Sequence, residues 1–157
     1  MADYISVENQ KELATSYRTG VKIVMVIALS VLVLMLIARY ISPETTLPGS
    51  ERLVRPILIT VIVLGLIVIF VRRLLMSQSM MAKVAPRGVK ALVGRLLTIT
   101  IICLVIALLV GLMGLAFYLI TGDYEYSWRL GVISLLLIFY SFPRRGEWER
   151  IISRNTQ

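Results

Sequence analysis

Residues 72 to 95 read RRLLMSQSMMAKVAPRGVKALVGR and connect the second and third of four apolar runs in the chain. This connector contains six basic residues and no acidic one. Because basic loops are retained on the cytoplasmic side of a membrane, the connector predicts the orientation that the chain would take in a membrane. Its basic residues are Arg72, Arg73, Lys83, Arg87, Lys90 and Arg95.

The composition of the whole chain favours membrane insertion. Of its 157 residues, 58% are hydrophobic, and the mean hydropathy is +0.85. Soluble domains contain roughly 45–50% apolar residues, so this chain has more apolar surface than a soluble core of its size can bury. We therefore expect a single all-α integral membrane domain over residues 1–157, located in the cell (inner) membrane.

Four apolar runs predict four transmembrane helices, arranged as an up-down bundle or as loosely packed helical hairpins. The fourth run is the weakest, because its uncharged core from Leu130 to Phe142 has only 13 residues. Interfacial aromatic residues before it and Pro143-Arg144-Arg145 after it favour a span nonetheless. The four predicted spans cover approximately residues 22–41, 54–72, 95–120 and 128–143.

The segment before the first span is polar and predicts a surface element. Within residues 1–20, a short helix from about Val7 to Tyr17 is expected to lie on the surface, with Ser6 as its N-cap. After the first span, residues 42–50 contain two prolines and a glycine. Since proline cannot continue a helix, these residues predict a loop.

The connector and the C-terminal tail predict further short elements at the membrane surface. In the connector we expect a short interfacial helix, a turn at Pro86-Arg87-Gly88 and an amphipathic lead-in to the third span. The basic tail, residues 144–157, places Trp148, Ile151 and Ile152 near one face of a helix. An amphipathic pattern of this kind predicts a helix that lies along the membrane surface.

Basic residues are distributed unevenly between the two sides that four spans create. Both termini and the connector fall on one side, which then holds thirteen of the 17 Lys and Arg residues. The positive-inside tendency therefore predicts cytoplasmic termini. The net charge of +8 is then explained by membrane topology and by contact with anionic lipid headgroups, and it does not indicate nucleic-acid binding. The opposite side holds only Arg39, Arg52, Arg55 and Arg129.

Two groups of residues are candidates for packing and for placement at the membrane interface. Small residues recur along the third run at spacings of four, four and three, which predicts a helix-packing seam. The alternative is that small residues are simply common in membrane helices. The seam consists of Cys103, Ala107, Gly111 and Gly114, and the predicted interfacial aromatic residues are Tyr124, Tyr126, Trp128 and Trp148.

The sequence offers little for catalysis. No ionisable residue lies within the four apolar runs, there is no histidine, and Cys103 is the single cysteine. Membrane-embedded charges, metal ligation by histidine and paired thiols are therefore not available. Hydroxyls such as Ser30, Thr60 and Thr98 are expected to bond the carbonyl one turn back. We predict a non-enzyme with no detectable cofactor or metal site, although a bound lipid or pigment would leave no pattern in the sequence.

These features favour an accessory, structural or assembly subunit of a larger membrane protein complex. Its expected partners are membrane lipids with anionic headgroups and larger membrane proteins. An oligomeric transporter or pore without embedded charges is the alternative, and a third possibility is an enzyme that acts on lipid headgroups. The residues expected to bind lipid, or an acidic cytoplasmic partner, are the six basic residues of the connector together with Arg144 and Arg145.

Overall fold

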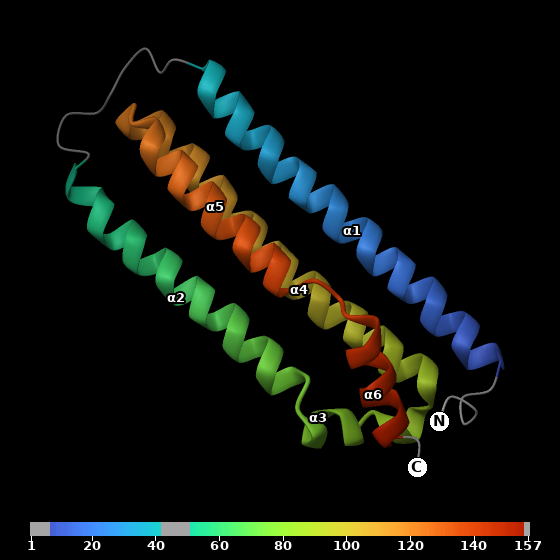
Figure 1. Cartoon of the computed structure of the whole chain (residues 1–157). Coiled ribbons are helices and arrows are strands. Elements are labelled where there is room, and N and C mark those ends of the chain that lie inside the picture. The colour runs from blue at the N-terminus through green and yellow to red at the C-terminus, as the bar shows by residue number, and fades with distance from the viewer. Residues whose placement is uncertain (1–6, 42–50, 156–157) are drawn as a thin grey trace.

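The computed structural model describes residues 7–41 and 51–155, and every regular element in this part of the chain is helical. The prediction of an all-α fold is confirmed. The predicted N-cap Ser6 and the predicted loop at residues 42–50 lie outside the described residues. The elements are α1 (Val7–Tyr40), α2 (Glu51–Leu75), α3 (Gln78–Ala82), a 3-10 helix η1 (Ala85–Arg87), α4 (Val89–Thr121), α5 (Tyr124–Tyr140) and α6 (Arg145–Asn155) (Figure 1).

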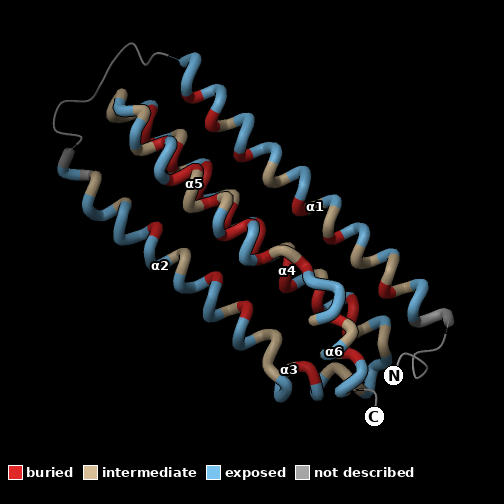
Figure 2. The backbone as a smooth tube through the Cα atoms, viewed as in Figure 1, coloured by how far each residue is buried: buried red, intermediate tan, exposed pale blue. Residues whose placement is uncertain are grey.

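The long helices are arranged around α4. α4 contacts α1, α2 and α5, and the α4–α5 pair lies between α1 and α2 (Figure 1). Successive long helices run in opposite directions, which is the up-down order that the sequence predicts. Buried residues on α1 and α2 recur on the side that faces this central pair (Figure 2). α1 and α2 therefore cover opposite sides of the central α4–α5 pair.

In the described residues, α1, α2 and α4 each contain a segment that is long and apolar enough to cross a membrane. The fourth predicted span forms a helix, but α5 has only 17 residues and α6 continues it after a bend of 42°. At about 1.5 Å per residue, α5 is about 25 Å long and shorter than a hydrocarbon core of roughly 30 Å. α5 and α6 together count as a fourth candidate span.

The prediction of a separate surface helix before the first span is wrong, because α1 is continuous over 34 residues. Nothing between Tyr17 and Ile23 interrupts the backbone ladder, and Gly20 is helical. The hydroxyls of Thr15 and Thr19 donate to carbonyls one turn back, at 2.9 and 3.0 Å, so they do not compete with the helix. At roughly 51 Å, α1 extends well beyond the length that a membrane requires.

The connector folds in the order that the sequence predicts. α3 is followed by η1, which contains Pro86, and by Gly88, whose φ of +90° suits glycine. The expected lead-in to the third span is not a separate element but the first two turns of α4. Leu92, Val93 and Leu96 from these turns are all buried. They give the helices at this end of the molecule an apolar surface to pack on.

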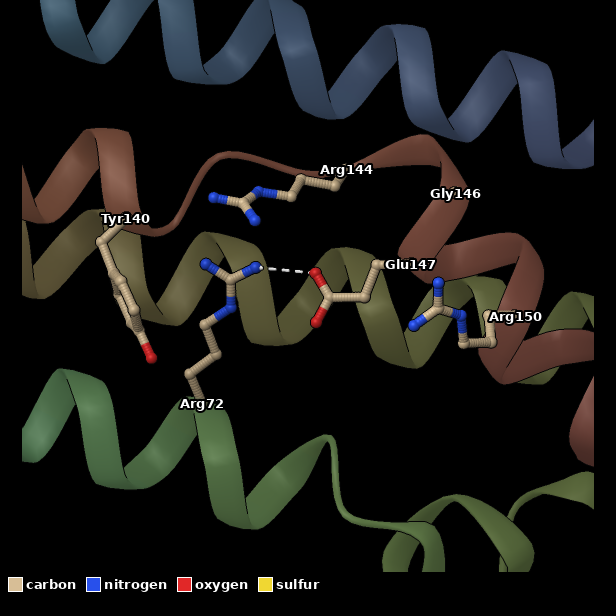
Figure 3. Close-up of a pocket in the computed structure, with 6 residues that line it drawn as sticks. All are labelled: Arg72, Tyr140, Arg144, Gly146, Glu147 and Arg150. Carbon is tan, nitrogen blue, oxygen red and sulfur yellow. Dashed lines mark hydrogen bonds and ion pairs between the residues drawn. The ribbon is translucent and has the colours of Figure 1, made fainter.

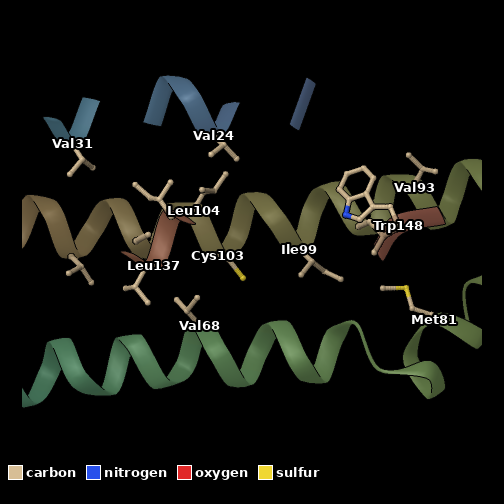
Figure 4. Packing of buried hydrophobic residues seen from close by; sticks show 14 of the residues in the cluster. Val24, Val31, Val68, Met81, Val93, Ile99, Cys103, Leu104, Leu137 and Trp148 are labelled. Carbon is tan, nitrogen blue, oxygen red and sulfur yellow. The ribbon is translucent and has the colours of Figure 1, made fainter. Parts of the chain in front are cut away.

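The starts of α1 and α4, together with α3 and α6, lie at one end of the molecule, which we call the basic end (Figure 1). α6 contacts α3 and α4 there. Trp148 and Ile152 of α6 are fully buried, and Figure 4 shows Trp148 beside α4. The centroid of the Trp148 ring lies 6.2 Å from that of Tyr17, with the two rings edge to face. The prediction that this face of the tail lies on the membrane surface is therefore wrong. Its apolar side chains cover the ends of α1 and α4, which extend past α5.

Candidate functional site

α2 contacts the rest of the molecule through one narrow stripe of residues. Val61 and Val68 are buried, and a side-chain carbon at Gly65 would lie 3.9 Å from Leu137 of α5. Arg72 follows on the same stripe, one turn after Val68. Its position directs the side chain toward the other helices, and Arg72 is only 8% exposed.

The Arg72 guanidinium has two partners, both from the C-terminal part of the chain (Figure 3). Its Nη2 donates to Glu147 Oε2 at 3.1 Å. Its Cζ lies 5.0 Å from the centroid of the Tyr140 ring, which is a cation–π distance. These contacts satisfy a guanidinium that is largely removed from solvent. They also connect α2 to the end of α5 and the start of α6.

A hollow of about 520 Å³ opens beside this ion pair. It presents three guanidinium groups and one carboxylate, so its lining has a net charge of +2. Arg144 and Arg150 form no ion pair within the described part of the chain, and both are exposed. The lining residues are Arg72, Tyr140, Arg144, Gly146, Glu147 and Arg150 (Figure 3).

The first turn of α6 adds to the positive potential of this hollow. The amides of Glu147 and Trp148 both bond the Arg144 carbonyl, at 3.0 and 3.1 Å, so α6 begins at the edge of the hollow. A helix N-terminus carries a partial positive charge. Gly146 lies there without a side chain, and a carbon added to it would meet nothing within 4 Å. An anion can therefore approach this turn without steric hindrance.

Of the eight basic residues predicted to bind lipid or a partner, only Arg72 and Arg144 meet in this hollow. Two of the others form exposed ion pairs: Lys90 with Glu12 at 3.5 Å, and Arg145 with Glu149 at 2.8 Å. The remaining four, Arg73, Lys83, Arg87 and Arg95, are exposed and lie outside the hollow.

Sequence reasoning missed Tyr140, Gly146 and Arg150 as parts of a site. It also gave no role to Glu147, which pairs with the buried Arg72. One signal was present in the sequence. Arg72 continues the stripe of Val61, Gly65 and Val68 at helical spacing, which places it toward the interior rather than toward headgroups.

The four small residues of the predicted seam are all buried in α4. A side-chain carbon at Gly111 would lie 3.1 Å from Ser134 Oγ, and one at Gly114 would lie 2.9 Å from Leu130 Cβ. Ser134 Oγ also donates to the Ala107 carbonyl at 2.6 Å. The helix that packs on this seam is therefore α5 of the same chain.

α5 contributes small residues of its own, which sequence reasoning missed. Ser127, Gly131 and Ser134 follow one another at spacings of four and three, and all three are buried. A side-chain carbon at Gly131 would lie 2.6 Å from the sulfur of Met35, so α1 closes on α5 at this point. Elsewhere the expectation for hydroxyls holds: Ser30, Thr60 and Thr98 bond carbonyls one turn back.

The predicted interfacial aromatic residues separate into two groups. Tyr124 and Tyr126 pack edge-on against Tyr118 and Phe117 at the end opposite the basic end, and Trp128 is half exposed there. Trp148 was predicted wrongly, because it is fully buried at the basic end. A large apolar ring gains more from burial between helices than from partial solvation at an interface.

The outer face of α2 is the least covered apolar surface among the three long candidate spans. Only 11% of the α2 span is buried, compared with 44% of the α4 span. Large side chains on this face are mostly exposed: Ile62 by 62%, Leu66 by 60% and Phe70 by 66%. A shallow apolar hollow of about 340 Å³ lies along it, lined by Val63, Leu66, Ile67, Phe70 and Val71.

Within the described residues, no three His, Cys, Asp or Glu side chains gather in a way that could hold a metal ion. Comparison of the chain with protein-family models, with curated proteins and with solved structures gives no match in any of the three. The arrangement therefore offers two surfaces for function: the arginine-lined hollow at the basic end and the apolar outer face of α2.

Proposed function

We propose that this chain is a multi-pass membrane protein with cytoplasmic termini, and that it serves as a non-catalytic accessory or assembly subunit of a larger membrane complex. The observation that carries this proposal is the outer face of α2. It is a continuous apolar helix surface with its own hollow, and it is attached to the rest of the chain only by the narrow stripe on its opposite side.

The spacing of residues on this face suits a partner helix. Val63, Leu66, Ile67 and Phe70 repeat at intervals of three and four, so their side chains form ridges with a groove between them. Lipid tails are as apolar as leucine, so helices associate in a membrane through close packing of such ridges and grooves. We propose an apolar transmembrane helix of a partner protein as the occupant.

The proposed orientation rests on the basic end. α3, α6 and the start of α1 gather there, together with thirteen of the 17 Lys and Arg residues. Retention of cations in the cytoplasm would place this end inside the cell. Asp123→Cys and Ser153→Cys variants test it, because both positions are exposed and the native Cys103 is buried. A membrane-impermeant maleimide should label Cys at 123, and not at 153, on intact cells.

The accessory role is tested by purification in mild detergent from the native membrane, followed by native mass spectrometry. We expect larger membrane proteins to copurify in fixed stoichiometry. A Leu66→Trp variant should lose them, because the larger side chain fills the hollow on α2. Leu29→Trp is the matched control, since Leu29 is 62% exposed on α1 and outside the hollow.

Two results would contradict the accessory role. A homogeneous homo-oligomer from the native membrane would favour a transporter or pore assembled from copies of this chain. Partners retained equally by both tryptophan variants would show that α2 is not the docking helix. Both variants should insert normally, because in the free subunit each new side chain faces lipid.

A further inference from the structure

We propose that the hollow at the basic end binds a phosphate monoester through Arg72, Arg144 and Arg150, and that this phosphate displaces the Glu147 carboxylate from Arg72. This site goes beyond the proposed accessory role and does not depend on a partner at α2. It combines cations from three separate segments: the end of α2, the α5–α6 junction and α6.

The charges of the site favour a strongly anionic ligand. Three guanidinium groups and one carboxylate give +2, and the α6 N-terminus adds a partial positive charge. A monoester carries between one and two negative charges and three terminal oxygens, so each guanidinium can take an oxygen of its own. A diester has only two free oxygens and a bulky second substituent. The site should therefore select monoesters over diesters of similar size.

In the Arg72–Glu147 pair, the Glu147 carboxylate is the group that a bound phosphate displaces. Arg72 is nearly buried, and its guanidinium stacks over the Tyr140 ring, so its position is fixed. Glu147 is different, because its side chain is 40% exposed and can rotate into solvent. A phosphate that replaces the carboxylate on Arg72 also meets Arg144 and Arg150, which have no acidic partner in the described chain. Exchange of one anion for another leaves Arg72 paired throughout.

The surroundings of the hollow match those of a lipid headgroup. Ile69 and Leu136 lie one helical turn before Arg72 and Tyr140, toward the apolar part of α2 and α5, and they are 44% and 63% exposed. A lipid with a monoester headgroup, such as phosphatidic acid, can place its phosphate in the hollow and its acyl chains along these faces. Free inorganic phosphate shares the headgroup chemistry but gains nothing from the apolar faces.

The test uses the full chain in phosphatidylcholine nanodiscs that contain either phosphatidic acid or phosphatidylglycerol at equal mole fraction, with bound lipid counted by native mass spectrometry. Arg150→Gln should lower phosphatidic acid retention about tenfold, the effect of losing one charge-assisted contact of roughly 1.4 kcal/mol. Arg154→Gln is the control, because Arg154 is also exposed on α6 and lies outside the hollow. Glu147→Gln removes the competing carboxylate and should raise retention several-fold.

A second arm separates the two sources of phosphate. Inorganic phosphate added to nanodiscs without phosphatidic acid is followed by its protection of Arg144 and Arg150 from tryptic cleavage. Protection by phosphatidic acid alone would assign the site to a lipid, and equal protection by inorganic phosphate would assign it to a soluble monoester. The proposal is overturned if neither protects, if phosphatidylglycerol binds as well as phosphatidic acid, or if Arg150→Gln and Arg154→Gln behave alike.

Discussion

Gly114→Ala should separate α4 from α5, while the same substitution at Gly94 of the same helix should not. The added carbon at position 114 would lie 2.9 Å from Leu130 Cβ and 3.4 Å from the Ser127 carbonyl oxygen. Leu130 Cβ is held directly by the α5 backbone, so no side-chain rotation relieves the contact. At Gly94 an added carbon meets nothing within 4 Å, and the position is exposed.

The two substitutions should therefore have opposite signs. Overpacking of a close interface costs about 1–3 kcal/mol, and alanine gains about 1 kcal/mol over glycine in a helix. Because the contact with Leu130 Cβ cannot relax by rotation, we take the upper part of the overpacking range, about 2–3 kcal/mol, and subtract the helical gain of about 1 kcal/mol. Gly114→Ala should then lower the free energy of unfolding by about 1 to 2 kcal/mol, and Gly94→Ala should raise it by about 0.5–1 kcal/mol. Gly111→Ala should fall between them, because its contact is the Ser134 hydroxyl, which can rotate.

Unfolding by SDS from mild detergent, followed by tryptophan fluorescence, measures these differences. The stability order should be Gly94→Ala, wild type, Gly111→Ala and Gly114→Ala, from most to least stable. If Gly114→Ala is as stable as Gly94→Ala, the two helices do not approach each other closely and the packing described for the seam is wrong. Equal helicity of the folded variants by circular dichroism is the necessary control.

Three further substitutions test other contacts in the same unfolding assay. Ser134→Ala removes an interhelical hydrogen bond and should cost about 0.5–1.5 kcal/mol, whereas Ser30→Ala, which loses only a bond within its own exposed helix, should change stability by less than about 0.5 kcal/mol. Glu147→Gln should lower the free energy of unfolding by about 1 to 2 kcal/mol, because it leaves the nearly buried Arg72 without its carboxylate partner. Glu149→Gln is the control and should lower it by less than about 0.5 kcal/mol, because the Arg145–Glu149 pair is exposed. Trp148→Ala removes a fully buried ring at a cost of about 3–5 kcal/mol, and faster tryptic cleavage of α6 should accompany it; unchanged cleavage would mean that α6 is held by other contacts.

The helical spans follow from the sequence because apolar run length is a local property. The first three predicted runs lie within α1, α2 and α4, and the fourth, Leu130 to Phe142, extends two residues past the end of α5. In the turn between α4 and α5, Gly122 has a φ of +74° and Asp123 is the N-cap of α5. The Asp123 side chain accepts from the Glu125 amide at 2.9 Å. Small residues in α4 likewise indicated a close contact, since only small side chains permit one.

The candidate site was harder to predict, because it joins residues that lie far apart in the sequence. Arg72 and Glu147 are 75 positions apart, and a charge at the end of a span usually faces headgroups. The apolar face of α6 was misassigned for a related reason. The spacing of Trp148 and Ile152 is the same whether the apolar face of α6 lies on lipid or packs on protein. It packs on protein here because α1 and α4 extend past the end of α5.

The short connection between α4 and α5 has a consequence for biogenesis. A segment of 17 residues is a poor substrate for independent release into a bilayer, because it does not cover the hydrocarbon core. Only Gly122 and Asp123 separate it from the 33 residues of α4, so in the membrane protein that we propose the two segments would reach the insertion machinery as one hairpin. Entry of α5 would then be coupled to that of α4. If α4 entered alone, Gly111 and Gly114 would face lipid until α5 covered them.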